Sequence, residues 1–296
     1  MISADQLVNI LATIALAELM FLLGLRVKIE QVRNVAKDSV LVAKAVIASY
    51  LVVPLLTIGL VMAFHVKPMI AAGFLIAVVC AGAPYGPPFT AMARGDVPVA
   101  VGVMVILSVL AAPVAPLLLY LLLPIIAGSQ SLAVNVLKVV LTLLLTQLLP
   151  LCAGLAIRWR KPESAIKLEV PAKRLSVPLN LLFIGVGLYA QWHTLARISA
   201  RGYLEMFVLA VATVVVGWML GGPDVRTRRA IAADTSVRNV GLGLVIATGS
   251  FAGTLAVSSA LVYAIFQTVV LALVFMAWGK AIPIGGTTVS TKTALI

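Results

Sequence analysis

Residues 82–88 read Gly-Ala-Pro-Tyr-Gly-Pro-Pro and lie inside an apolar stretch that is long enough to cross a membrane. Proline and glycine interrupt a helix, and a helix broken at membrane depth leaves backbone amides and carbonyls without partners. Such a break is tolerated only where the backbone is buried in protein or lines a wet cavity, as at the substrate sites of many secondary transporters. The stretch therefore predicts a discontinuous transmembrane helix near the functional centre of the protein.

The composition is that of a membrane protein with several transmembrane helices. Hydrophobic residues make up 62% of the 296 residues and charged residues only 11%, a balance outside the range of soluble domains. Since a helix needs about 20 apolar residues to span the hydrocarbon core, we predict an all-α polytopic membrane protein with about nine transmembrane helices. Their approximate ranges are residues 4–26, 39–64, 69–93, 97–127, 131–157, 175–192, 203–221, 227–250 and 254–279.

The net charge of +12 is spread between the apolar segments and not gathered on one face or arm, which argues against a nucleic-acid partner. Most of the 22 Lys and Arg residues fall on one side of the expected membrane, as in the stretch from Arg158 to Arg174. Cytoplasmic loops carry an excess of Lys and Arg. We therefore expect a multi-pass protein of the inner (plasma) membrane with its N-terminus outside and its C-terminus in the cytoplasm.

The chain divides into two halves of opposite orientation. Residues 158–174 are basic and contain proline, and we predict that they form a cytoplasmic loop. We assign residues 1–157 to a first repeat that lacks its first helix, together with the fifth helix. Residues 175–282 form the rest of the second repeat, and residues 283–296 form a cytoplasmic tail. The third helix then runs inward and the eighth runs outward, as inverted repeats require.

The eighth segment is too polar for a helix that faces lipid, because it contains Asp234, Thr235, Ser236, Arg238 and Asn239. Its position corresponds to that of the proline-glycine break, so we predict that two discontinuous helices cross near the membrane midplane. Asp234 and Arg238 are four residues apart, which places both on one helix face in the order that favours pairing. They form either a neutralising pair that holds the bundle together or a site in which Arg238 faces an anionic ligand.

Glu18 and Lys44 lie inside the first and second segments. Counting 1.5 Å per residue from the helix ends puts them at similar depths, which predicts a salt bridge between the two helices. The alternative is that Lys44 extends to the cytoplasm and that Glu18 is protonated or faces a cavity. In that case Glu18 is a candidate proton site.

Motifs along nearly the whole chain resemble the bile acid:sodium symporter family. Cys80–Gly82 (Cys-Ala-Gly) followed by Ala93–Val97 (Ala-Arg-Gly-Asp-Val) resembles the family's Cys-Pro-Gly-Gly-x-x-Ser-Asn … Ala-Arg-Gly-Asp/Asn-Val stretch. Leu110–Leu117 resembles the proline-containing helix that follows, and Leu23–Leu25 (Leu-Gly-Leu) fits the end of the first helix. Ala232–Leu242 resembles the family's Ile-Glu-x-Gly-x-Gln-Asn-x-Gly-Leu.

The resemblance implies the nine-helix form of the family fold. Helices three, four, seven, eight and nine would form a core domain that begins with helix two, and helices one, five and six would form a panel domain. Rigid movement between panel and core would then give alternating access to the substrate.

The chain departs from the family pattern at the positions that bind sodium. The family's sodium-binding Ser and Asn fall on Gly86 and Pro87, and its Ser and Thr on the next helix fall on Ala100 and Met104. The resemblance therefore implies that four oxygen ligands of the first sodium site are missing.

At the second sodium site, the family's Glu, Gln and a further Gln become Asp234, Arg238 and Ser49. A cation site needs several converging oxygens, and a guanidinium repels a cation. We expect that Arg238, balanced by Asp234, takes the place of sodium. Coupling to protons through Asp234 or Glu18, exchange of anions and uncoupled passage remain alternatives.

We predict a secondary transporter of a small or amphipathic organic anion that works by alternating access without sodium. A sodium-coupled organic anion symporter with altered ligands and a ligand-binding sensor without transport are the alternatives. An enzyme is not expected, because the acids within the membrane lie on distant segments without a nucleophile and base. The expected partners are the organic anion and the lipid bilayer, with no cofactor or metal, and the oligomeric state is open. The predicted substrate-binding residues are Pro84, Tyr85, Gly86, Pro87, Thr90, Arg238, Asn239 and Gln267; the ion or charge-balance residues are Asp234, Arg238 and Ser49; the candidate proton sites are Glu18 and Asp234.

Overall fold

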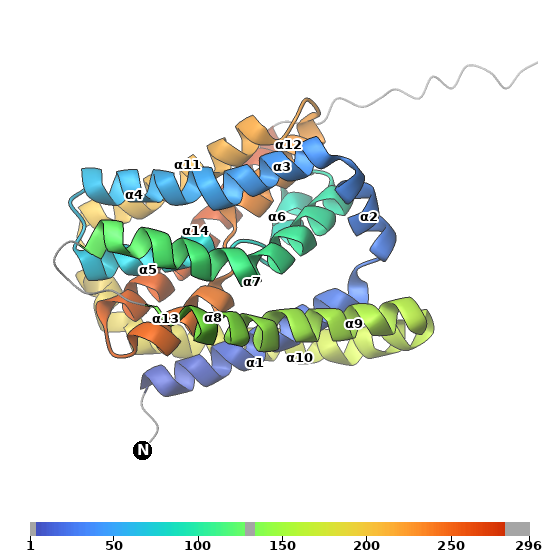
Figure 1. Ribbon diagram of the computed structural model, residues 1–296, viewed down its shortest axis with the longest axis horizontal. Coiled ribbons are helices and arrows are strands. Elements are labelled where there is room, and N and C mark those ends of the chain that lie inside the picture. The colour runs from blue at the N-terminus through green and yellow to red at the C-terminus, as the bar shows by residue number, and fades with distance from the viewer. Residues whose placement is uncertain (1–3, 128–133, 282–296) are drawn as a thin grey trace, which may run out of the picture.

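The computed structural model describes residues 4–127 and 134–281, and in these residues the chain forms helices and turns with no strand (Figure 1). The prediction of an all-α polytopic membrane protein is confirmed. Residues 131–133 of the predicted fifth segment and the predicted tail lie outside the described residues. The helices are α1 (Ala4–Arg26), α2 (Ile29–Lys37), α3 (Ser39–Ile47), η1 (Ala48–Val52), α4 (Val53–Ala63), α5 (Pro68–Val79), α6 (Gly86–Met92), α7 (Val97–Ala127), α8 (Val136–Leu143), η2 (Leu144–Leu148), α9 (Leu149–Arg160), α10 (Pro162–Arg197), α11 (Ala200–Leu220), α12 (Val225–Ser236), α13 (Val240–Phe251) and α14 (Leu255–Ala281).

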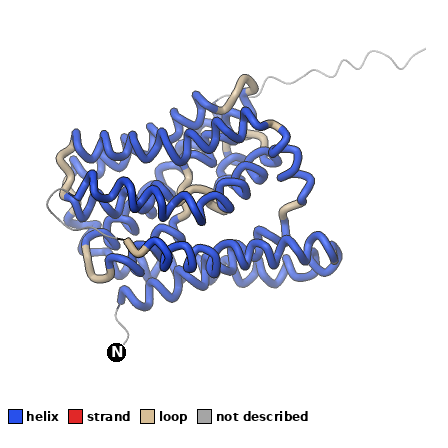
Figure 2. Tube along the Cα trace, in the orientation of Figure 1, coloured by secondary structure: helices blue, strands red, loops and turns tan. Residues whose placement is uncertain are grey.

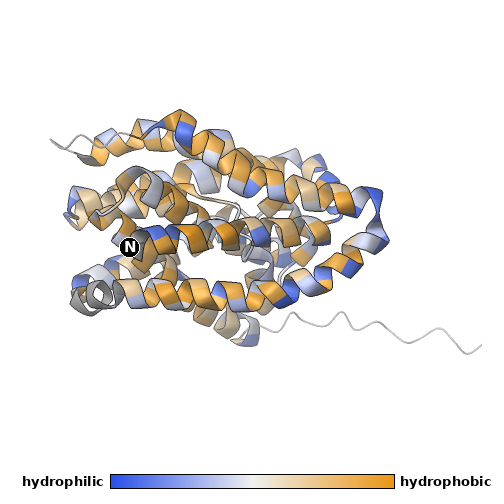
Figure 3. Ribbon diagram, turned by 90° about the horizontal axis from the view of Figure 1, so that it is seen from below, coloured by the Kyte–Doolittle hydropathy of each residue, from blue (hydrophilic) through white to orange (hydrophobic). Residues whose placement is uncertain are grey.

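Within the described residues, seven helical spans are long and apolar enough to cross a membrane. They correspond to seven of the nine predicted segments, with α12 and α13 together forming one of them. The other two predicted segments are α5 with α6, which a break divides, and the apolar half of α10. Apolar residues dominate along the length of the helices (Figure 3).

Residues 158–174 differ from the predicted loop, because almost all of them are helical. α9 continues to Arg160, Lys161 makes the turn, and α10 begins at Pro162. Proline is favourable in the first turn of a helix, where its missing N–H is not needed and its fixed φ suits the helix. α9 and α10 therefore form a tight helical hairpin instead of two helices joined by a long loop.

The panel consists of α1, α8–η2–α9 and α10, which lie together along the lower side of Figure 1. α1 and α9 approach each other at Gly24 and Gly154. A methyl group on Gly24 would overlap the carbonyl oxygen of Leu151, and one on Gly154 would overlap that of Phe21. Small residues at such a crossing let two membrane helices pack backbone against backbone, so the panel forms one packed unit.

The core consists of the remaining long helices, with α2 connecting α1 to α3 at one end of the bundle. α5 packs against α14, α7 and α13, and α12 packs against α11, α6 and α7. Two short loops lie in the middle of this bundle, where Figure 2 shows them in tan. The panel meets the core mainly through α1 on α13, α10 on α14, and α8–η2 on α7 and α13. The division into core and panel that the family resemblance implies is thus present.

Two of the long helices contain a π-helical segment directly before a proline. η1 precedes Pro54, the second residue of α4, and η2 precedes Pro150, the second residue of α9. A π-helical turn inside an α-helix is uncommon and often occurs at functional sites. Each segment holds one buried polar residue, Ser49 in η1 and Gln147 in η2.

We call the end of the bundle at which α1, α9, α6 and α14 finish the basic end, and the other the opposite end. The basic end carries Arg26, Arg94, Arg158, Arg160 and Arg226. Arg26 pairs there with Glu169 of α10 at 2.8 Å between Nε and Oε1. The charge asymmetry read from the sequence is therefore also an asymmetry of the folded bundle.

Candidate functional site

The two predicted helix breaks meet inside the core. The first break separates the end of α5 at Val79 from the start of α6 at Gly86, and the second separates α12 from α13. The backbone N–H of Asn239 in the second break donates to the carbonyl of Cys80 in the first, at 2.8 Å. Two discontinuous helices therefore cross, as the sequence predicted, and part of the broken backbone is satisfied by the other break.

Two helix N-termini face this crossing. α6 starts there with Gly86 and Pro87, and α13 starts there with Val240. The side-chain oxygen of Asn239 caps α13 by accepting from the N–H of Leu242 at 3.1 Å. Helix N-termini carry partial positive charge and helix C-termini partial negative charge. The N-terminus of α13 therefore favours negative charge beside Arg238, whereas α5 and α12 end at the crossing with partial negative charge.

Asp234 lies in the last turn of α12 and points at Gly86. Its side chain is 2% exposed, and neither carboxylate oxygen has a hydrogen-bond partner among the described residues. A methyl group on Gly86 would overlap Oδ1 of Asp234. The carboxyl group of Asp234 thus lies against the backbone of α6 at Gly86, where no side chain comes between them.

Arg238 is almost completely buried in the second break. Its Nη1 donates to the carbonyl of Ser49 in η1 at 3.4 Å, and Gln267 of α14 donates to the carbonyl of Arg238 at 3.4 Å. Nε and Nη2 of Arg238 have no hydrogen-bond partner in the described parts of the chain. The hydroxyl of Ser49 and the side-chain oxygen of Gln267 are likewise buried without a partner there. Both hydrogen-bond donors and hydrogen-bond acceptors without partners therefore surround the crossing.

The pairing of Asp234 with Arg238 that the spacing predicts is not formed. The ion pair between Arg26 and Glu169 is the one found in the described residues. α12 ends at Ser236, and Val237 takes an extended conformation with φ −79° and ψ 114°. Because the helix stops between the two residues, the four-residue spacing no longer places them on one face. Asp234 turns toward α6, and Arg238 turns toward η1.

The profile of the Sodium Bile acid symporter family matches residues 13–197, which is more than half of the chain. The protein belongs to this family. The resemblance that the motifs indicate is thereby confirmed, and family membership supports a multi-pass membrane transporter for a small solute and argues against an enzyme.

Two relatives show how far the similarity extends. The chain is 26% identical over 285 residues to a Bacillus subtilis (strain 168) protein named uncharacterized sodium-dependent transporter YocS, which covers 91% of this chain and 83% of the relative. It is 26% identical over 198 residues to sodium/bile acid cotransporter 5 of Rattus norvegicus, covering 67% of this chain and 44% of that protein. The similarity to the bacterial relative thus runs along most of both chains.

The family's motif positions come together at the crossing in this structure. Gly86, which the resemblance places at a sodium-ligand position of the family, lies beside Asp234, and Ser49 lies beside Arg238. Ala100 and Met104 of α7 are buried, but their side chains have no oxygen. Thr90, one turn after Gly86, donates its hydroxyl to the carbonyl of Gly86 at 3.0 Å within α6.

Two of the predicted substrate-binding residues connect the core of this symporter fold to the panel. Tyr85, next to Pro84 in the first break, donates its hydroxyl to Asn180 of α10 at 2.8 Å. Asn239 donates to the side-chain oxygen of Gln147 in η2 at 3.4 Å. These hydrogen bonds cross the boundary between the two domains, so a movement of the panel would have to break or exchange them.

The predicted salt bridge between Glu18 and Lys44 is absent from the described residues. Glu18 lies on α1 in the panel, within electrostatic range of Ser176 and Tyr85. Lys44 lies on α3, on the far side of the core, where it lines a cavity at the basic end with Asp38, Asp96 and Asp224. Similar depth in the membrane did not bring the two helices together, because depth says nothing about position around the bundle.

Sequence reasoning missed Ser108 and Gln147. The hydroxyl of Ser108 in α7 donates to the carbonyl of Gly82 in the first break at 2.7 Å, and Gln147 donates to the carbonyl of Ser108 at 2.6 Å. A hydrogen-bonded chain therefore runs from the first break through α7 and the panel to Asn239. A buried amide in an otherwise apolar segment was the signal that could have identified Gln147.

Proposed function

We propose that this member of the family transports a small or amphipathic organic anion by alternating access and does not use sodium as its coupling ion. The observation that carries the proposal is the guanidinium of Arg238, buried at the helix crossing with Nε and Nη2 lacking partners among the described residues. Since a buried unpaired charge is costly, an anion that binds here would supply the missing partner.

The geometry around Arg238 favours an anionic group. The N-terminus of α13, which begins two residues after Arg238, adds positive potential there. A guanidinium presents two parallel N–H donors to a carboxylate or a phosphate. Asn239 and Gln267 lie next to Arg238 and can add polar contacts to the rest of the substrate.

The surroundings of Asp234 argue against a sodium site of the family type. Sodium needs several converging oxygens, by analogy with other oxygen-ligated cations. Gly86, Pro87, Ala100 and Met104 offer no side-chain oxygen, and the hydroxyl of Thr90 is engaged within α6. At the four positions that the resemblance assigns to the first sodium site, the side chains thus offer no oxygen to a cation.

A sodium-coupled mechanism is the second candidate, and two observations favour it. Both relatives carry names that refer to sodium. Both oxygens of the Asp234 carboxyl group also lack hydrogen-bond partners in the described residues, so a proton or a cation bound there would satisfy them. In our proposal Asp234 holds a proton, and Glu18, near Tyr85 at the panel, is the other candidate for proton transfer.

We further propose that the basic end faces the cytoplasm of the cell, with the N-terminus outside and the protein in the plasma membrane. The excess of Lys and Arg at this end is the observation behind it. Substrate passage would then follow movement of the panel against the core, with the contacts of Tyr85 to Asn180 and of Asn239 to Gln147 changing between the two states.

The experiment is thermal unfolding of the purified protein in detergent, titrated with NaCl against KCl and choline chloride at equal ionic strength. A bound ligand stabilises the folded state by about 2.7 kcal/mol at 100 times its dissociation constant. Coincident curves are expected. A sodium-specific rise in Tm would contradict the proposal and support the second candidate.

A series of small carboxylates in the same assay identifies the class of anion that binds. Uptake of the strongest stabiliser into proteoliposomes then tests transport. Stabilisation without uptake would indicate a sensor. Uptake that is unaffected by Arg238→Gln would remove the basis of the anion proposal.

A further inference from the structure

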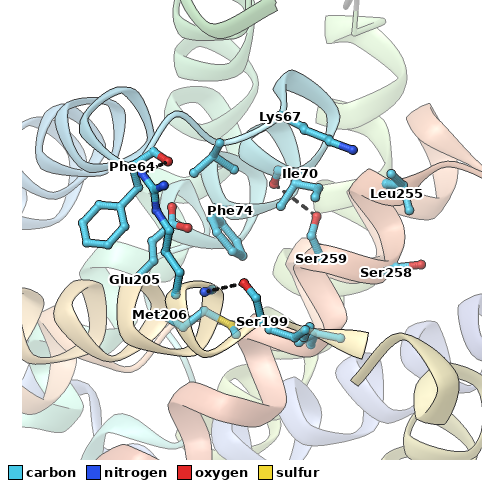
Figure 4. Close-up of a pocket in the computed structure, with 15 residues that line it drawn as sticks. Phe64, Lys67, Ile70, Phe74, Ser199, Glu205, Met206, Leu255, Ser258 and Ser259 are labelled. Carbon is cyan, nitrogen blue, oxygen red and sulfur yellow. Dashed lines mark hydrogen bonds between the residues drawn. The ribbon is translucent and has the colours of Figure 1, made fainter. Parts of the chain in front are cut away.

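A cavity of about 610 Å³ lies at the opposite end of the core, away from the helix crossing. It is enclosed by the turn between α4 and α5, the first turns of α11 and the first turns of α14 (Figure 4). None of the residues at the crossing lines it, and its walls come from core helices, the turn between α4 and α5, and the connection from α10 to α11.

Glu205 is the buried acidic residue among those that line this cavity. It lies on α11 and is 5% exposed, and its Oε1 has no hydrogen-bond partner among the described residues. In Figure 4 its side chain rises from α11 toward Phe74 and the turn that carries Phe64. A buried carboxylate without a donor is unstable unless something supplies one, so the cavity is prepared for a group that donates hydrogen bonds.

The mouth of the cavity carries positive charge. Arg201 lies one turn before Glu205, donates to the carbonyl of Phe64 at 2.7 Å and stacks over the ring of Phe64 at 5.8 Å. Lys67 is exposed at the start of α5. α5, α11 and α14 all begin at this mouth, and their N-termini add partial positive charge.

The acid and the cations do not neutralise one another directly. In the described part of the chain, no ion pair joins Glu205 to Arg201 or Lys67. Arg201 is held by Phe64 instead of by Glu205. Between the two charged regions, the walls are apolar and are formed by Ile70, Phe74, Met206 and Val262.

We propose that this cavity binds a small zwitterion, with an ammonium group at Glu205 and a carboxylate, sulfonate or phosphate group at Arg201 and Lys67. The site goes beyond the proposed transport function and does not depend on it. Glu205 follows Arg201 by four residues on α11, which is a rise of about 6 Å between their Cα atoms, and we take a similar separation for the two charges of the ligand. That distance corresponds to about three or four methylene groups between the two charges of the ligand. Free ω-amino acids and the phosphoethanolamine headgroup of a lipid both have this pattern.

The test is thermal unfolding in detergent free of phosphatidylethanolamine, with a series from glycine to 5-aminopentanoate and with phosphoethanolamine. We expect a saturable rise in Tm that is largest for 4-aminobutanoate and 5-aminopentanoate. Butanoate and butylamine, which each keep one charge, should bind at least about tenfold more weakly, because each lacks one charge-assisted hydrogen bond. A response that does not depend on the spacer length would overturn the proposal.

Variants separate the two charged regions. Glu205→Gln should weaken the binding of 4-aminobutanoate at least about tenfold and leave the binding of butanoate unchanged. Arg201→Gln should weaken the binding of both compounds. Glu30→Gln and Lys138→Gln are the matched controls, since both residues lie outside the cavity. Binding to Glu205→Gln as tight as to the wild type would contradict the assignment.

If Glu205→Gln does not fold, Glu205→Asp gives an independent result. Shortening the side chain by one methylene group should move the preferred ligand to a longer spacer, and an unchanged preference would count against the proposal. Nanodiscs then distinguish the source of the ligand. Loss of the response to free amino acids in the presence of phosphatidylethanolamine identifies the lipid headgroup as the occupant, and an unchanged response identifies a free solute. Both of these results support a zwitterion site.

Discussion

The first helix break is supported by other helices, whereas the second supplies its own polar groups. In the first, residues 80–85 contain one hydrogen-bonding side chain besides the thiol of Cys80, that of Tyr85. The carbonyl of Gly82 depends on Ser108 of α7, and the carbonyl of Cys80 depends on the backbone of Asn239. In the second, Asn239 caps α13, Asp234 lies in the last turn of α12 before the break, and Arg238 lies within the break.

The comparison shows that inverted repeats can share a backbone arrangement without sharing chemistry. Both breaks satisfy the same requirement, which is that interrupted backbone must find partners away from lipid. The ionisable groups at the crossing, however, come from α12 and the second break. Changes in the second break should therefore alter function, and changes around the first should alter mainly stability.

The largest expected effect is that of Arg238→Gln on transport. Uptake of the most stabilising carboxylate should fall at least about 100-fold, roughly 2.7 kcal/mol, because the variant removes a full positive charge from the crossing. Thermal stability should stay the same or rise, since a buried guanidinium with unpartnered nitrogens is costly to fold. Lys167→Gln, in which an exposed cation of α10 is lost, is the control. Uptake at the wild-type rate in Arg238→Gln would show that the two breaks do not differ in function.

The second-largest expected effect is the loss of stability in Asn239→Ala. The variant loses both the cap of α13 and the contact with Gln147, which should cost about 2 kcal/mol. Asn239→Ser keeps a capping oxygen and should recover about half of the loss. The measurement is equilibrium unfolding in mixed micelles. Equal stability of Asn239→Ala and the wild type would mean that α13 does not need its cap.

Ser108→Ala tests the support of the first break. It leaves the buried carbonyl of Gly82 without its donor, which should cost about 1 to 2 kcal/mol. Thr142→Ala is a matched control, because the Thr142 hydroxyl donates to a carbonyl of its own helix at 2.8 Å. The same unfolding assay applies, and the loss for Ser108→Ala should be smaller than for Asn239→Ala. An equal loss for Ser108→Ala and Thr142→Ala would show that the first break does not depend on this donor.

The smallest expected effect is the coupling between Asp234 and Arg238. In a double-mutant cycle with Asp234→Asn and Arg238→Gln, the interaction energy should be below about 0.5 kcal/mol, as for residues that act independently. A buried ion pair would instead lose about 3 kcal/mol or more when one partner is removed. A coupling of that size would show that the two side chains meet in the protein.

The features that sequence predicted best are those that hydrophobicity and backbone chemistry determine within a single segment. The apolar runs, the break before Gly86 and the polar stretch around Asp234 each carry their own signal, and the corresponding positions of the two breaks predicted the crossing. Interactions between segments were predicted less well. The spacing of Asp234 and Arg238 assumes a continuous helix, and the depths of Glu18 and Lys44 ignore position around the bundle.

Secondary structure outside the membrane was also less predictable. Basic residues and two prolines favoured a loop at residues 158–174, but Pro162 begins a helix that packs against α1 and α9 within the panel. The support of Gly82 by Ser108 could not be read from sequence, because a single serine in an apolar helix most often bonds to its own backbone.

The two π-helical segments have a mechanical consequence for alternating access. A π-helical turn holds one residue more than an α-helical turn. Rewinding η1 or η2 into α-helix would rotate one half of its helix against the other by about 100°, the angle that one residue occupies. Such a rotation would carry Ser49 away from Arg238, or Gln147 away from Asn239, while the helix itself stayed folded. The core and the panel therefore each contain, next to the crossing, a π-helical segment at which one half of a helix can rotate against the other.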